Sequence, residues 1–348
     1  MPEHMTPKVV AAGDGFVRTD ILRKALAEQG LVDNVVDIDN DWPLTPLVDI
    51  DGVHEANGDQ DALVAALRGA QVLITHTQPV TQRVLQASPD LRLVVICRGG
   101  PVNADIDAAT AAGVMVTNTP GRNANATTEH SLGMILAATR QISQRDAELK
   151  AGQWRADYYQ YDEVGPEIFG STVGLVGYGA IGRRVRAALV AMGAQVLVFD
   201  PFLKEALPEG VELVDELDDL LRRSAILTIH ARATADNAGL IGRRELALLP
   251  RGAVVVNCAR PQLLDYDALA DALASGHLYS AAADVLPSEP LPADHRLLQI
   301  PNLTVTPHLA GASKEAAWIA ARTGAADIAA FVQGKKPTNL VNPEVWKG

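Results

Sequence analysis

Short apolar runs that do not alternate with polar residues recur along this chain, and segments with helical periodicity separate them. Six of these runs follow one another in the second half of the chain, at 172–177, 195–200, 225–230, 253–257, 279–284 and 303–306. Runs of this kind suit strands that are buried on both faces, as in a parallel sheet. Strands that alternate with helices indicate right-handed βαβ units. The pattern therefore predicts an α/β fold, and six strands match a complete dinucleotide-binding sheet.

A second and weaker group of apolar runs precedes residue 120, at 8–12, 34–38, 72–76, 93–97 and 114–118. With 348 residues, the chain has room for two domains. Between the two groups, residues 127–148 have helical spacing and predict one long helix, followed by a polar and aromatic segment at 152–170. A last helix is expected at 313–333, after the final strand.

Composition excludes several classes of protein. Forty-two acidic residues against 30 basic ones give a net charge of −12, which argues against a nucleic-acid or an anionic membrane surface as partner. The two cysteines, Cys97 and Cys258, form neither a disulfide framework nor a metal-binding pattern. The start of the chain has no signal-peptide core, and no apolar stretch is long enough to span a membrane. We expect a cytoplasmic protein without a metal site.

A glycine-rich motif follows the strand expected at 172–177. Gly177, Gly179 and Gly182 have the GxGxxG spacing of dinucleotide-binding folds, and Tyr178, Ala180 and Ile181 fill the positions between them. Such a loop lets a pyrophosphate approach the backbone at the start of a helix. Asp200 ends the next strand, where a carboxylate accepts hydrogen bonds from ribose hydroxyls and repels a 2′-phosphate. These features favour NAD over NADP, although the nearby Lys204 could still pair with a 2′-phosphate. The alternative without any cofactor is an ordinary glycine turn followed by a solvated aspartate.

Three later segments, 257–260, 284–290 and 306–311, resemble signature motifs of the D-isomer-specific 2-hydroxyacid dehydrogenases. The resemblance extends from about residue 93 to residue 343 and includes the segment 117–121 and the glycine-rich loop. It implies two Rossmann-like or flavodoxin-like parallel-sheet domains and hydride transfer between NAD(H) and a D-2-hydroxy acid or its 2-oxo acid. The arginine, glutamate and histidine of the family motifs correspond to Arg260, Glu289 and His308.

These three residue types suit the reduction of a 2-oxo acid. The planar guanidinium of Arg260 matches a carboxylate. His308 changes its charge near neutral pH and can donate a proton to the carbonyl oxygen. Glu289, bonded to the other ring nitrogen, would orient the imidazole and favour its protonated form.

The resemblance also implies the remaining site residues. His230, at a strand end, is an equally good candidate for a purely structural histidine, and His130 is expected to be structural. Arg98, Gly99, Gly100 and Arg260 are the expected substrate contacts. The expected cofactor contacts are the glycine-rich loop from Gly177 to Gly182 together with Asp200, His230, Ala231, Cys258, Ala259, Arg260, Asp284, His308 and Gly311.

In this family the dinucleotide domain is inserted into the substrate domain. The resemblance therefore implies a discontinuous substrate domain at 1–117 and 312–348, and an NAD-binding domain at 118–311. It further implies a homodimer built by the helix at 127–148 and the aromatic segment after it. The chain ends too soon after the last motif for the extra regulatory domain that some members carry.

Several positions depart from the family pattern. Pro261 and Arg232 stand where the family commonly has glycine and proline, and Val102 replaces a loop glycine, so the substrate stays open. A formate dehydrogenase of the same fold is a poor alternative, because it needs an uncharged residue at Glu289. An NADH-binding corepressor of the same fold is the alternative from another class of protein.

Overall fold

The computed structural model describes residues 7–204, 207–208 and 210–347, and within them the chain forms two compact units. One unit comprises residues 1–123 and 312–348, and the other comprises 124–311. We expected the chain to cross between domains near Asn118 and Ala312; the division falls between Asn123 and Ala124 and between Gly311 and Ala312.

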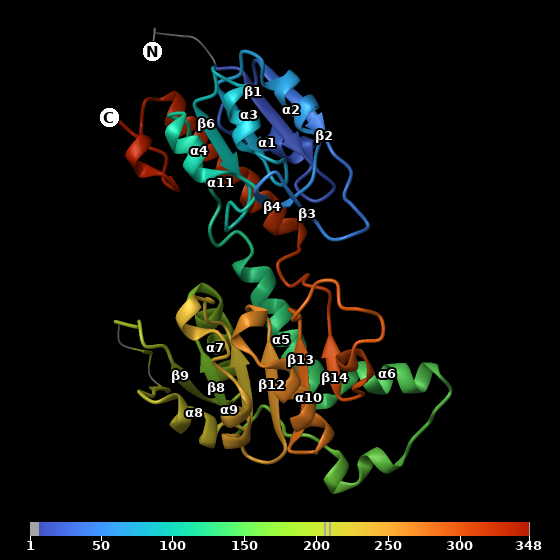
Figure 1. Ribbon diagram of the computed structural model, residues 1–348. Helices are drawn as coiled ribbons and strands as arrows, with labels where there is room; N and C mark the ends of the chain where they lie inside the picture. Colours follow the sequence, from blue (N-terminus) through green and yellow to red (C-terminus); the bar gives the residue numbers. More distant parts are fainter. Residues whose placement is uncertain (1–6, 205–206, 209, 348) are drawn as a thin grey trace. The chain divides into compact units, whose positions relative to one another are not determined.

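The first unit is built on a five-stranded parallel sheet in the order β2-β1-β5-β6-β7 (Figure 1). Its strands are β1 (Val9–Gly13), β2 (Val35–Asp39), β5 (Val72–Thr75), β6 (Leu93–Ile96) and β7 (Met115–Thr117). A short antiparallel hairpin of β3 (Val48–Ile50) and β4 (Val53–Ala56) is added, which the sequence analysis did not predict. The helices are α1 (Thr19–Glu28), α2 (Gln60–Leu67), α3 (Gln82–Gln86), α4 (Ile106–Ala111) and α11 (Lys314–Val332).

Alternate residues of one strand enter different hydrophobic clusters. In β1, Val9 and Ala11 pack with α1 and α11, whereas Val10 and Ala12 pack on the opposite face with Leu63. Successive side chains of a strand point to opposite faces, so helices cover both faces of this sheet. The last helix, α11, packs against α1 and β6, and this joins the end of the chain to its beginning (Figure 1).

The second unit contains a seven-stranded parallel sheet in the order β10-β9-β8-β11-β12-β13-β14. Six strands coincide with the predicted runs: β8 (Thr172–Val176), β9 (Gln195–Phe199), β11 (Ile226–Ile229), β12 (Ala253–Asn257), β13 (Leu278–Ala283) and β14 (Leu303–Val305). The seventh, β10 (Val211–Leu213), is a short edge strand that was missed. The prediction of an α/β fold with two parallel-sheet domains is confirmed. The other helices of this unit are α7 (Ala180–Ala191), α8 (Leu217–Arg223), α9 (Arg243–Leu248) and α10 (Tyr266–Ala274).

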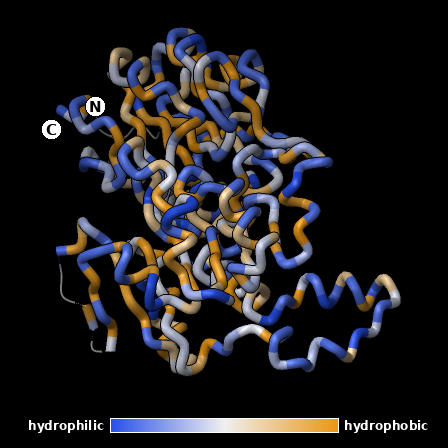
Figure 2. The backbone as a smooth tube through the Cα atoms, turned by 60° about the horizontal axis from the view of Figure 1, so that its bottom comes forward, coloured by the Kyte–Doolittle hydropathy of each residue, from blue (hydrophilic) through white to orange (hydrophobic). Residues whose placement is uncertain are grey.

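The prediction of one helix over 127–148 is wrong. The chain forms α5 (Ala124–Arg140) and α6 (Ile142–Lys150), which are separated by Gln141. Gln141 has φ of +46°, a left-handed conformation that ends the first helix. Because of this break, α6 and the aromatic segment after it extend away from the sheet of their unit (Figures 1 and 2).

Candidate active site

The glycine-rich loop joins β8 to α7, as its motif requires. Gly177 has φ of +94°, and a Cβ atom there would lie 2.4 Å from the backbone nitrogen of Ala231. A Cβ on Gly179 would meet nothing within 4 Å, so the backbone is open at the position where the motif brings a pyrophosphate close. Gly179 is also the N-cap of α7, whose first backbone N–H groups have no partner within the helix. This geometry fits a dinucleotide.

Asp200 lies directly after β9 and braces this loop. Its Oδ2 accepts a hydrogen bond from the backbone of Tyr178 at 2.8 Å, and its Oδ1 accepts one from the backbone of Phe202 at 3.0 Å. The ring of Tyr178 is buried, and its hydroxyl accepts a hydrogen bond from Arg186. Backbone N–H groups therefore fix both oxygens of Asp200, the carboxylate predicted to select the cofactor, next to the glycine-rich loop.

His308 and Glu289 form a direct pair. Nδ1 of His308 lies 2.7 Å from Oε2 of Glu289, and the backbone of Leu286 donates to the other oxygen of Glu289 at 3.0 Å. The hydrogen bond to Glu289 raises the pKa of His308, although burial opposes the shift. Burial raises the pKa of Glu289, but its bonds to His308 and Leu286 outweigh that effect and lower it. The two shifts show that the pair favours a carboxylate on Glu289 and a protonated imidazole on His308.

Asp284 anchors the loop that carries His308. It is fully buried at the end of β13, and its Oδ1 accepts hydrogen bonds from the Thr306 hydroxyl at 2.6 Å and the Leu309 backbone at 3.0 Å. Its Oδ2 accepts from the backbone of Ala310 at 2.9 Å. Burial raises the pKa of Asp284, but these bonds and His130 together lower it to about 2. An ionised Asp284 thus fixes both sides of His308, which itself has φ of +51°.

Arg260 is near enough to His308 for the positive charge of its guanidinium to lower the pKa of the histidine. Nη1 of Arg260 donates to the carbonyl of Ala259 at 2.7 Å, and Asn257 donates to the carbonyl of Arg260 at 3.0 Å. The unusual Pro261 is the first residue of a 3₁₀ turn, Pro261–Leu263, where a proline has no hydrogen bond to lose. This departure from the family pattern is therefore compatible with the backbone.

His230 is placed at the end of β11, beside the glycine-rich loop. Its Nε2 lies 2.9 Å from the Thr228 hydroxyl, and its Nδ1 is buried without a hydrogen-bond partner among the described residues. Burial lowers its pKa to about 4, so His230 is neutral at physiological pH. Cys258 is also buried, and burial raises the pKa of its thiol to about 12.

The expected substrate contacts on the first unit lie in the loop after β6. The guanidinium of Arg98 donates to the backbone carbonyl of Glu55 at 3.0 Å and forms an ion pair with the carboxylate of the same residue. The carbonyl of Gly99 accepts a hydrogen bond from Asn118 at 2.7 Å, and Gly100 is exposed.

Residues 132–310 match the family model described as "D-isomer specific 2-hydroxyacid dehydrogenase, NAD binding domain". This match spans half of the chain. The chain belongs to this family. Its second unit therefore carries the family's NAD-binding domain.

Named relatives agree with this assignment. The D-3-phosphoglycerate dehydrogenase of Mycobacterium leprae is 41% identical over 261 residues, which are 74% of this chain and 48% of the relative. The glyoxylate reductase of Thermofilum pendens is 34% identical over 318 residues, 90% of each chain. The chain thus spans about half the length of the D-3-phosphoglycerate dehydrogenases that it matches.

Solved structures share the fold. The TT0316 protein of Thermus thermophilus superimposes with a TM-score of 0.78 at 28% identity, covering 96% of this chain and 99% of the other. The NAD-complexed form of a D-isomer specific 2-hydroxyacid dehydrogenase from Lactobacillus delbrueckii ssp. bulgaricus gives a TM-score of 0.77 at 22% identity, covering 96% and 100%.

Two features of the site were not foreseen from the sequence. His130 was expected to be structural without a known partner; its Nε2 lies 3.1 Å from the Thr306 hydroxyl and 3.4 Å from Oδ1 of Asp284. Asp284 was assigned only to the cofactor, whereas the structure shows it as the anchor of the His308 loop. No local pattern in the sequence announces these contacts, because they join residues that are far apart in the chain.

The described residues include neither a membrane-spanning helix nor a cluster of metal ligands. None of their helices has both the length and the apolar character needed to cross a membrane. Within the same residues, no three side chains of histidine, cysteine, aspartate or glutamate come together as metal ligands.

Proposed function

We propose that this protein is an NAD(H)-dependent oxidoreductase that interconverts a D-2-hydroxy acid and its 2-oxo acid. The observation that carries the proposal is the 2.7 Å contact between His308 and Glu289 on the family's NAD-binding domain. NAD(H), when bound, supplies the hydride chemistry.

In the reductive direction, His308 donates a proton to the carbonyl oxygen of the substrate. Glu289 occupies Nδ1, so the transferable proton is the one at Nε2. Glu289 also stabilises the protonated ring before the transfer. Arg260 binds the substrate carboxylate, and Arg98, Gly99 and Gly100 hold the rest of the molecule. In the oxidative direction His308 accepts the proton.

For the cofactor, we propose contacts from the loop Gly177–Gly182, from Asp200 and from the expected residues near the strand ends. Asp200 binds the ribose hydroxyls and disfavours a 2′-phosphate. His230 and Cys258, both neutral, would offer the cofactor surfaces without charge.

We also propose a cytoplasmic homodimer. The segment after α6 exposes Trp154, Tyr159 and Tyr161, with 83%, 97% and 91% of their surfaces accessible. By contrast, the guanidinium groups of Arg145 and Arg155 lie over the ring of Tyr158, with their Cζ atoms 3.2 and 4.3 Å from its centre. Large exposed aromatic side chains in a segment that is fixed by contacts such as those of Tyr158 are typical of a protein–protein interface.

The activity is tested by NADH consumption with a panel of 2-oxo acids, including glyoxylate, hydroxypyruvate and a phosphorylated acid. We expect turnover with at least one of them, and its loss in His308→Asn with retained NADH binding. Tight NADH binding without turnover of any acid would instead support the sensor alternative.

A further inference from the structure

A second cluster of ionisable residues lies in the first unit, at the carboxyl ends of its strands. Asp14 follows β1, His76 follows β5, and Arg122 belongs to the loop after β7. In this sheet β1 stands between β2 and β5, so the crevice between β1 and β5 is the point where parallel α/β sheets bind ligands. The proposed function assigns no role to these three side chains.

Asp14, His76 and Arg122 are joined by hydrogen bonds. Asp14 Oδ1 accepts from the backbone of Phe16 at 2.9 Å and of Val17 at 2.8 Å, and its Oδ2 accepts from the Thr77 hydroxyl at 2.8 Å. Nδ1 of His76 also lies 2.8 Å from Oδ2, and Nε2 of His76 lies 3.3 Å from Nη2 of Arg122.

The tautomer of His76 follows from these partners. Arginine can only donate, so Nε2 carries the lone pair and the ring proton is on Nδ1, bonded to Asp14. Burial lowers the pKa of His76 more than Asp14 raises it, which agrees with a neutral ring. Asp14 and His76 therefore position Arg122 without neutralising it directly.

Arg122 keeps unused donors. Its Nε and Nη1 atoms are buried and have no hydrogen-bond partner within the described part of the chain. Burial lowers its pKa, but a guanidinium stays charged in proteins. Buried cations without a partner are costly, and planar guanidinium donors match the oxygens of a carboxylate or a phosphate.

Surrounding side chains fix the site and add charge. The ring centre of Phe16 lies 5.6 Å from Cζ of Arg122, and the ring of Trp42 stacks on His76 at 5.9 Å. The positive charge of Arg98 acts on both His76 and Arg122. Arg98 already has a carboxylate partner in Glu55, whereas Arg122 has none among the described residues.

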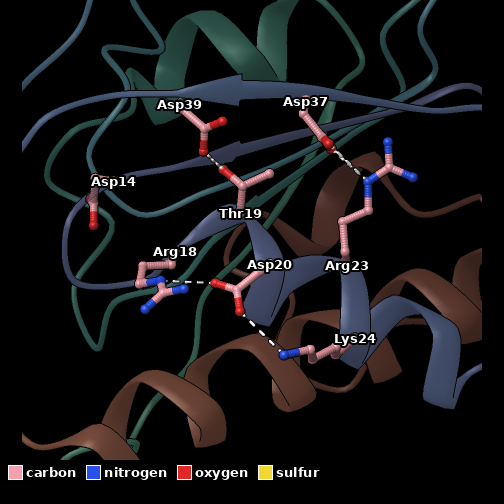
Figure 3. Close-up of a pocket in the computed structure, with 8 residues that line it drawn as sticks. All are labelled: Asp14, Arg18, Thr19, Asp20, Arg23, Lys24, Asp37 and Asp39. Atoms are coloured by element: carbon pink, nitrogen blue, oxygen red, sulfur yellow. Dashed lines mark hydrogen bonds and ion pairs between the residues drawn. The ribbon is translucent and has the colours of Figure 1, made fainter.

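A neighbouring pocket provides a contrast within the same unit. It has a volume of about 520 Å³ and includes Arg18, Arg23 and Lys24 in its lining (Figure 3). Each of these cations pairs with an aspartate: Arg18 and Lys24 with Asp20, and Arg23 with Asp37 (Figure 3). That pocket therefore offers no comparable unsatisfied cation.

We propose that Arg122, held by His76 and Asp14, is the centre of an anion-binding site that takes a carboxylate or phosphate group. Two sources have this chemistry: a second acidic group on the 2-oxo acid substrate, or a separate small anion. Only the first source depends on the proposed function.

Calorimetric titration of the full chain with inorganic phosphate and with malonate tests the site without using activity. We expect binding to the wild type, binding at least about tenfold weaker in Arg122→Met, and an unchanged affinity in the control Arg23→Met. Thermal unfolding adds a readout of structure. If Arg122 serves an absent anion, Arg122→Met without anion unfolds at the same or a higher temperature than the wild type. A large fall in that temperature, equal binding in both proteins, or no binding of either anion at millimolar concentration would overturn the site.

Steady-state kinetics then separates the two sources. If the anion is part of the substrate, Arg122→Met raises KM for a phosphorylated 2-oxo acid at least about tenfold more than KM for glyoxylate. Equal effects on both acids, with phosphate binding lost, identify a separate small anion. If no 2-oxo acid is turned over, the proposed function fails, and calorimetry still decides the anion site.

Discussion

Nδ1 of His308 lies 2.7 Å from Oε2 of Glu289, and this contact links the charge of a loop carboxylate to the proton that the histidine can donate. The two residues are 19 positions apart, and Asp284 holds the loop that carries His308. The pair is therefore built by two separate loops of one sheet edge.

The pH dependence of reduction tests this pair. The hydrogen bond to Glu289 raises the pKa of His308, so reduction is fast while the ring is protonated and slows as pH rises through that pKa. In Glu289→Gln the negative charge is gone, and the falling limb of kcat/KM against pH should move to lower pH. Glu289→Asp keeps the charge and should move it less. An unmoved limb in Glu289→Gln would remove Glu289 as the partner.

Asp284→Asn tests the anchor of the loop that carries His308. The pKa of Asp284 is about 2 in the folded protein against a usual 3.8, so its ionised form stabilises the fold above pH 3.8, and this is lost as pH falls toward 2. We expect Asp284→Asn to lower the free energy of unfolding by about 2 kcal/mol at neutral pH. The difference from wild type should shrink in acid. Urea denaturation at neutral and at acidic pH measures this difference. In Asp284→Asn, the backbone amides of Leu309 and Ala310 should exchange hydrogen faster, and unchanged exchange would contradict the anchoring role.

Cofactor choice tests Asp200. The wild type should prefer NAD(H), because the carboxylate repels a 2′-phosphate. In Asp200→Ala the ratio of kcat/KM for NADH over NADPH should fall on the order of tenfold, as expected for removing a like charge. Asp200→Asn, which keeps an acceptor for the backbone of Tyr178, separates the loss of charge from a loosened loop. Equal kcat/KM with both cofactors in the wild type would contradict the assignment.

Substitution of Arg260 and substitution of Arg98 should change different kinetic parameters. In the proposed function Arg260 binds the reacting end of the substrate, and Arg260→Ala should then lower kcat by at least about 10²-fold. Arg98, paired with Glu55 in this structure, should hold the remote end. Arg98→Ala should mainly raise KM, and more for a phosphorylated acid than for glyoxylate. Equal damage to kcat by both substitutions would refute this division.

The oligomeric state tests whether the exposed aromatic segment forms a dimer interface. Sedimentation of the wild type should show a dimer, and Trp154→Ser combined with Tyr159→Ser should weaken it at least about tenfold, in the range of losing aromatic anchors of an interface. Leu44→Ser changes a fully exposed side chain of the first unit and serves as the control. A monomeric wild type would exclude the proposed interface.

Most of the fold could be predicted from the sequence, because buried parallel strands are local patterns. Each predicted strand run coincides with an observed strand, and the glycine-rich loop lies between β8 and α7 as its spacing demands. Short edge strands such as β10 bury little, so their sequences carry a weak signal. The break at Gln141 has no glycine or proline to announce it, and the buried side chain of this residue donates to the carbonyl of Tyr279, which is distant in sequence.

The sequence by itself determined the family, the kinds of residue at the candidate active site and the expected cofactor, since these depend on motifs of contiguous residues. Only the tertiary structure decided how those residues are held. It placed Asp284 against both flanks of His308, and it assembled Asp14, His76 and Arg122 from positions 62 and 46 residues apart. Hydrogen bonds between distant loops depend on where each strand ends in space, and no local pattern in the chain encodes that position.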